Sequence, residues 1–182
     1  MIGRIGMGLF GMAVLAAPVW GQVPADEQAF LDKHMSDVVA ITPKRLNDAA
    51  IVKAFSAPIY ELNIVMNMGD GGSSSQKQIV AKVDDKLVPV SRPGSDGDCP
   101  QIAKMMNPAF MLKTDDDAKA LQAALDLLFP TVTDDDKKAI AFSHSGSNWM
   151  FYRGTFFANK LGFVFTTDGS GKVTAVKFSL KL

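Results

Sequence analysis

The most regular pattern of apolar and polar positions lies at the C-terminal end of the chain. Stretches rich in Phe, Val and Thr alternate there with polar residues, which is typical of half-buried strands. Two groups of Gly, Asn and Asp residues interrupt the pattern and supply the backbone conformations of tight turns. The pattern therefore predicts an antiparallel β-meander of three strands, Asn148–Phe157, Gly162–Thr167 and Lys172–Leu182.

The strands of this meander differ in how many apolar faces they have. In the last strand Val176 and Phe178 share an apolar face while Lys177 points the other way, so one side is expected to face solvent. The two earlier strands are apolar on both faces. We favour helices covering the second face, because helix 115–129 has an apolar stripe to bury. The alternative is a concave binding surface, with Trp149, Phe151, Arg153, Phe157, Phe163 and Phe165 as the candidate binding residues.

A second strand pattern lies in the first half of the chain. Within Ile59–Met68 one set of alternate residues is wholly apolar and the other set is mostly polar, as in a strand with one buried face. Gln76–Val83 returns as a second strand, and Leu87–Val90 follows after a turn. Pro89 lacks a backbone donor, which places this last piece at a sheet edge.

Helical periodicity and end signals predict helices around these strands. An apolar stripe runs along Asp115–Phe129, and Pro130 ends the helix. Thr42 and Pro43 read as an N-cap followed by proline at the first helical position, so a short helix is expected from Lys44 to Phe55. The other predicted helices are Ala25–Ala40, Cys99–Met106 and a short turn after Thr133.

Together these elements predict an α+β fold with antiparallel meander sheets and helices packed on one face. A chain of 182 residues can bury one sizeable core, so residues 22–182 are expected to form a single domain. Each half of the chain has helices followed by strands. The sequence therefore also allows two similar halves, 25–91 and 99–182, joined by a connector rich in Gly, Ser and Asp.

The N-terminus has the pattern of an export signal. Arg4 supplies a short positive region, an apolar run follows to Val19, and the first acidic residue is Asp26. The run is too short to span a bilayer comfortably, and small residues suggest cleavage between Gly21 and Gln22. We therefore expect residues 1–21 to be a signal peptide and the mature protein to be periplasmic or secreted, with no transmembrane segment.

The charge balance argues against nucleic acid as a partner. The chain has 19 basic and 19 acidic residues, a formal net charge of zero. No basic cluster of the kind that binds phosphates is present. An unknown protein or a small ligand remains as the expected partner, and no cofactor is expected.

Few residues suggest catalysis. Cys99 is the only cysteine, so no internal disulfide forms, and it precedes Pro100 at a predicted helix start, where a thiolate is stabilised. A nucleophilic thiol also needs a base, and nothing places His34 or His144 beside it. His144 lies between two serines without the elbow motif of a serine hydrolase, so a hairpin loop is the better interpretation. An enzyme built from dispersed Asp, Ser and His residues is kept as an alternative.

Two features suggest metal binding, and each has a simpler interpretation. Thr-Asp-Asp-Asp occurs at 114–117 and at 133–136. Calcium needs six or more oxygens from one loop, whereas this pattern fits a helix capping box. Met66 and Met68 share a strand face and have the soft sulfurs that Cu(I) prefers, but they also continue an apolar face into the core. No metal site is expected, and a Cu(I) carrier is kept as a second alternative.

The leading functional hypothesis follows from these points. The sequence predicts an exported small globular protein without enzymatic activity. Its expected role is that of a binding or envelope-associated interaction protein that acts through its sheet.

Overall fold

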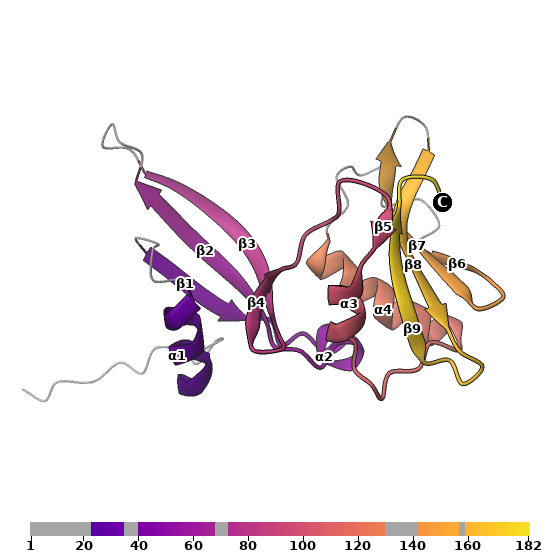
Figure 1. Ribbon diagram of the computed structural model, residues 1–182, viewed down its shortest axis with the longest axis horizontal. Coiled ribbons are helices and arrows are strands. Elements are labelled where there is room, and N and C mark those ends of the chain that lie inside the picture. The colour runs from indigo at the N-terminus through magenta and orange to yellow at the C-terminus, as the bar shows by residue number, and fades with distance from the viewer. Residues whose placement is uncertain (1–22, 35–39, 68–72, 130–141, 157–158) are drawn as a thin grey trace, which may run out of the picture.

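The computed structural model describes residues 23–34, 40–67, 73–129, 142–156 and 159–182. These residues form four helices and two antiparallel sheets of four and five strands, which confirms the predicted α+β class (Figure 1). The predicted signal peptide, Met68, the turn after Thr133 and Phe157 lie outside the described residues.

The N-terminal sheet is built from strands in chain order. It consists of β1 (Ala40–Arg45), β2 (Ile59–Asn67), β3 (Ser73–Val83) and β4 (Lys86–Pro89), so the predicted edge position of Pro89 is confirmed. Helix α1 (Ala25–His34) covers one face, where Leu31 packs in a buried cluster with Tyr60 and Leu62. An ion pair of 2.7 Å between Arg45 Nη1 and Glu27 Oε1 also ties α1 to β1.

The prediction of a helix beginning after Pro43 is wrong. Thr42 and Pro43 lie in β1, paired with β2, and helix α2 spans only Ala49–Ala54. Its N-cap is Asp48, whose side chain accepts a hydrogen bond from the Ala50 backbone. Strand β1 is at the sheet edge, where proline can be accommodated without losing a ladder hydrogen bond. A Thr-Pro pair suits an extended chain as well as a helix start, and the pairing with β2 decides between them.

Helix α1 is also shorter than its pattern predicted, because it ends at His34 and β1 already begins at Ala40. Ala40, the last residue of the predicted helix, is the first residue of β1 and pairs with Val65 of β2. A short apolar stretch does not by itself distinguish the end of a helix from the start of a strand.

The C-terminal sheet contains the predicted meander. Its strands are β5 (Gly97–Asp98), β6 (Phe142–Ser145), β7 (Asn148–Phe156), β8 (Asn159–Thr167) and β9 (Val173–Ser179), in the spatial order β5-β9-β8-β7-β6. Gly146 has a φ of 57° in the turn between β6 and β7, so a hairpin is present, but His144 lies in strand β6 and not in the predicted loop. Strand β5 and the backbone of Cys99 bond to the edge of β9, so this edge of the sheet is partly paired.

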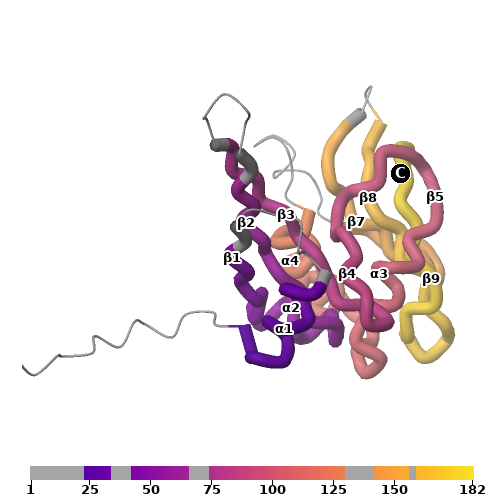
Figure 2. The backbone as a smooth tube through the Cα atoms, turned by 60° about the vertical axis from the view of Figure 1, so that its left-hand side comes forward, coloured from indigo at the N-terminus to yellow at the C-terminus, as the bar shows by residue number. Residues whose placement is uncertain are grey.

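Two helices lie between the sheets. Helix α4 (Asp115–Leu128) runs between the N-terminal and C-terminal sheets, and α3 (Pro100–Met105) packs beside β9 (Figure 2). The predicted stripe of α4 is buried, with Ala118, Leu121 and Leu125 fully inaccessible. One apolar cluster includes residues of both sheets together with α2, α3 and α4. The helices therefore cover the aromatic face of the meander.

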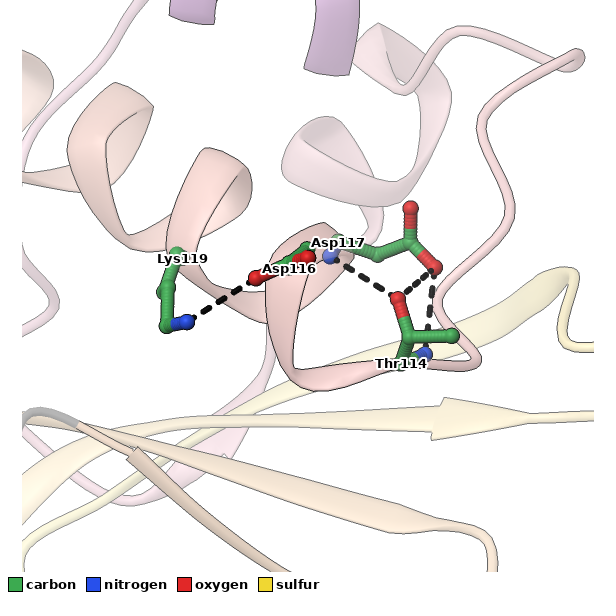
Figure 3. A network of polar contacts seen from close by, with 4 residues as sticks. All are labelled: Thr114, Asp116, Asp117 and Lys119. Carbon is green, nitrogen blue, oxygen red and sulfur yellow. Dashed lines mark hydrogen bonds and ion pairs between the residues drawn. The ribbon is translucent and has the colours of Figure 1, made fainter.

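The predicted capping box at the start of α4 is present (Figure 3). The Asp117 backbone N–H donates to Thr114 Oγ1 at 3.3 Å, and the Thr114 N–H donates to Asp117 Oδ2 at 3.1 Å. Burial raises the pKa of the Asp117 carboxyl, but hydrogen bonds from Thr114 and the Lys113 backbone outweigh it, so the net pKa is lowered. Asp116 pairs with Lys119 at 2.9 Å. The first Asp triplet thus begins a helix, and the second lies outside the described residues.

Candidate functional site

The candidate binding aromatics are brought together inside the protein. Trp149 is 5% exposed, and Phe151, Phe163 and Phe165 are fully buried. Their rings touch each other, as the centroid distance of 5.3 Å between Phe151 and Phe165 shows. Direct contact between these rings and a partner would require α4 to move away. Their role in binding stays a prediction, and Phe157 lies outside the described residues.

Arg153, the remaining candidate, lies at an irregularity in β7. Tyr152 pairs with Gly162 and Gly154 pairs with Leu161, so Arg153 is the extra residue of a β-bulge. Gly154 has a φ of 142°, a conformation that side chains rarely allow. Bulges of this kind redirect a side chain and are common beside functional sites. Here the bulge accompanies an arginine that is only 1% exposed.

The guanidinium group of Arg153 has one partner among the described residues. Its Nη1 donates a short hydrogen bond to Asp126 Oδ1 on α4, and Gln122 Nε2 donates to the same oxygen at 2.9 Å. Nε and Nη2 of Arg153 and Oε1 of Gln122 are buried without a hydrogen-bond partner. Burial lowers the pKa of the Arg153 guanidinium, and the Asp126 carboxylate acts in the opposite direction.

The face of the C-terminal sheet that points away from α4 is open to solvent. We call it the outer face, and Asn148, Val164, Thr166, Lys177 and Ser179 define it. A hollow of about 570 Å³ crosses β5, β9, β8 and β7 there and includes all five residues. Thr166 Oγ1 donates to Asn148 Oδ1 at 2.9 Å. The sequence pattern placed Lys177 only on a solvated side of the last strand, because the hollow depends on how four strands curve together.

The connector before α3 forms the rim of this hollow. Asp96 accepts a short hydrogen bond from the Leu180 backbone N–H, and Asp98 lies 3.7 Å from Lys177 Nζ. The rim of the hollow thus carries both negatively charged and positively charged side chains. The connector is held against the edge of the sheet by contacts on both sides of β5.

Cys99 and His144 do not form a catalytic pair. Cys99 lies beside β9 with 4% exposure, and His144 lies in β6 at the opposite edge of the sheet. Burial raises the pKa of the Cys99 thiol, which disfavours the reactive thiolate form. The His144 ring stacks on Trp149 with centroids 4.6 Å apart. No carboxylate of the described residues is hydrogen-bonded to either side chain, and the His34 side chain lies outside them.

The described part of the chain contains no group of three or more His, Cys, Asp or Glu residues arranged to hold a metal ion. This result does not test the Cu(I) alternative, which depends on the Met66 side chain and on Met68, and neither of these is described. It stays an untested prediction.

Comparison with known proteins gives no match: no family model matches the chain, nor does any curated protein or solved structure. Among the described helices, none has the length and hydrophobicity needed to cross a membrane.

Proposed function

We propose that the protein is an exported, non-enzymatic binding protein that contacts another protein through the outer face of its C-terminal sheet. The hollow of about 570 Å³ on this face supports the proposal. It offers an apolar centre at Val164, surrounded by the hydrogen-bonding groups of Asn148, Thr166 and Ser179. An apolar centre with a polar rim is the usual composition of a protein–protein interface.

The form of the hollow favours a protein over a small molecule. Small-molecule sites enclose most of the ligand surface and are lined mainly by apolar groups. This hollow is open and its lining is mixed, with Asp98 and Lys177 at the rim. A protein partner can cover such a surface and complement both charges.

The packing on the opposite face of the same sheet supports the idea that the outer face has its binding shape before a partner binds. Phe151, Phe163 and Phe165 pack under α4, and Phe163 lies 5.2 Å from the Phe178 ring. Strands anchored in this way need little rearrangement on binding, which reduces the entropic cost of association. The aromatic residues thus have an indirect part in the proposal, because they hold the outer face in shape.

A photo-crosslinking residue at Val164 tests this proposal in cells that export the protein. The matched control carries the same residue at Val52 on α2, whose side chain is 55% exposed. We expect a crosslinked product of defined mass from position 164 and none from position 52. A Thr166→Arg variant with an unchanged circular dichroism spectrum should lose that product. Equal crosslinking from both positions, or none at 164, would contradict the proposal.

A further inference from the structure

Arg153 carries an unusual electrostatic cost. Moving a charged group out of water costs several kcal/mol even after the protein relaxes, and well-placed partners must offset it. Arg153 is 1% exposed, and its partner Asp126 has a side chain that is 53% exposed. Water competes for such a carboxylate and weakens its attraction. An apolar side chain of similar volume would fill this position at a lower cost.

The two unpartnered nitrogens form one edge of the guanidinium group. Asp126 occupies Nη1, which leaves Nε and Nη2 without a partner. The Nε–H and one N–H of Nη2 point in nearly the same direction, because the guanidinium is planar. This edge matches the spacing of two oxygens on one carbon or phosphorus atom, and such bidentate pairs are among the strongest hydrogen bonds in proteins.

We propose that the Nε and Nη2 edge of Arg153 is a binding site for a small oxyanion, a carboxylate or a phosphate, held between α4 and β7. The ligand presents two oxygens to the edge while Asp126 keeps the other side of the guanidinium in place. This site is separate from the outer face, because Arg153 lies on the helix-covered side of the sheet. It stands independently of the proposed protein partner.

The backbone conformation around Arg153 supports a specific role for this side chain. Gly154 has a φ of 142°, and Gly162 lies opposite Tyr152 at the start of the bulge. A Cβ at Gly162 would come within 2.0 Å of the Phe151 carbonyl oxygen. These two glycines thus permit an irregular pairing of β7 with β8 beside Arg153. A regular pairing would be enough if this position had only to fill an apolar core. Backbone of this kind persists where it places a functional side chain.

Burial predicts how the ligand exchanges. Neither Nε nor Nη2 has accessible surface, so no water-sized space adjoins them and the anion enters and binds only when the surrounding side chains move apart. Local opening of this kind is slow compared with diffusion. A bound carboxylate is therefore expected to survive purification, and exchange with added anions should need prolonged incubation or warming.

Thermal unfolding of the mature chain tests the site. The protein is dialysed into sodium chloride, acetate or phosphate at pH 7 and equal ionic strength. With the ligand at about a hundred times its Kd, we expect the wild-type Tm to rise by roughly 5–10 °C in acetate or phosphate relative to chloride. The salt that gives the rise distinguishes a carboxylate ligand from a phosphate ligand.

The variants separate the site from general salt effects, since phosphate stabilises many proteins by exclusion. Arg153→Lys keeps the charge and loses the bidentate edge, so its anion-dependent rise should disappear. Lys160→Met removes a charge from the neighbouring strand β8, where Lys160 is exposed, and should keep the full rise. Equal rises in the wild type and Arg153→Lys would overturn the proposal.

A second measurement keeps the test decisive if the Arg153 variants do not fold. Nuclear magnetic resonance with ¹³C-labelled acetate, and ³¹P resonance with phosphate, should show saturable binding of one anion per wild-type chain. Mass spectrometry of the small molecules released by denaturation should identify any copurified acid. The absence of saturable binding and of any released oxyanion would show that no oxyanion pairs with Arg153, and the proposal would be wrong.

Discussion

Replacing Phe163 by alanine should strongly destabilise the protein. Its side chain is fully buried, with ring centroids 4.8 Å from Phe129 and 5.2 Å from Phe178. The substitution removes a ring that links α4 to the centre of the C-terminal sheet and leaves a cavity that tightly packed neighbours cannot fill. Phenylalanine-to-alanine changes in such sites cost about 3–5 kcal/mol.

This cost is large compared with the stability of a typical domain, which is about 5–15 kcal/mol. For a chain of this size each kcal/mol corresponds to roughly 2–4 °C, so Tm should fall by roughly 6–20 °C. Urea unfolding can be followed through Trp149, which is the only tryptophan after the predicted cleavage site and is 5% exposed. The slope of the unfolding free energy against urea concentration should stay unchanged if the folded and unfolded states keep their exposed areas.

Two further variants make this measurement specific. Phe163→Leu keeps most of the apolar volume and should cost about 1 kcal/mol. Val52→Ala alters a side chain that is 55% exposed and should change stability by less than about 0.5 kcal/mol. A loss below about 1 kcal/mol for Phe163→Ala would refute the assignment of this ring to the core. It would favour a direct contact surface on the aromatic face.

Three further predictions concern the capping box, a close backbone approach and the thiol. Thr114→Ala should cost about 1 kcal/mol in urea unfolding. The pKa of Asp117 is lower in the folded protein than in the unfolded chain, so its ionised carboxylate should add to the free energy of unfolding above the unfolded value of about 4. This contribution should be lost as pH falls through the folded pKa. Asp117→Asn should reduce the dependence of stability on pH in this acidic range. Gly162→Ala should cost at least about 2 kcal/mol, since its Cβ would meet the Phe151 carbonyl oxygen at 2.0 Å, and a Tm near that of wild type would contradict the observed register. Cys99 should react with Ellman's reagent at pH 8 far more slowly in the folded protein than in urea, because burial raises its pKa, and equal rates would show an accessible thiol.

Elements with local signals could be predicted from the sequence. Helix α4 has its apolar stripe, its capping box and Pro130 within one short stretch, so each signal supports the others. The meander is defined in the same way by alternation and by turn residues such as Gly171, whose φ is 84°. These signals depend on neighbouring residues only, and long-range packing reinforces them.

The start of α2 could not be predicted in this way. Thr42 and Pro43 are compatible with a helix start and with an extended edge strand, and their pairing with Asn63 and Leu62 selects the strand. That pairing joins residues about twenty positions apart, so no local pattern contains it. The candidate sites have the same limitation, because Arg153 meets Asp126 across 27 positions of the chain.

The sequence by itself determined the α+β class, the alternation of the meander and the two apolar faces of its inner strands. Tertiary structure decided what each face does, because a face is buried or open only according to what packs on it. Helix α4 covers the aromatic rings, while the outer face keeps the open hollow around Val164. The same packing encloses Arg153 and leaves one edge of its guanidinium without a partner, a feature that spacing along the chain does not encode.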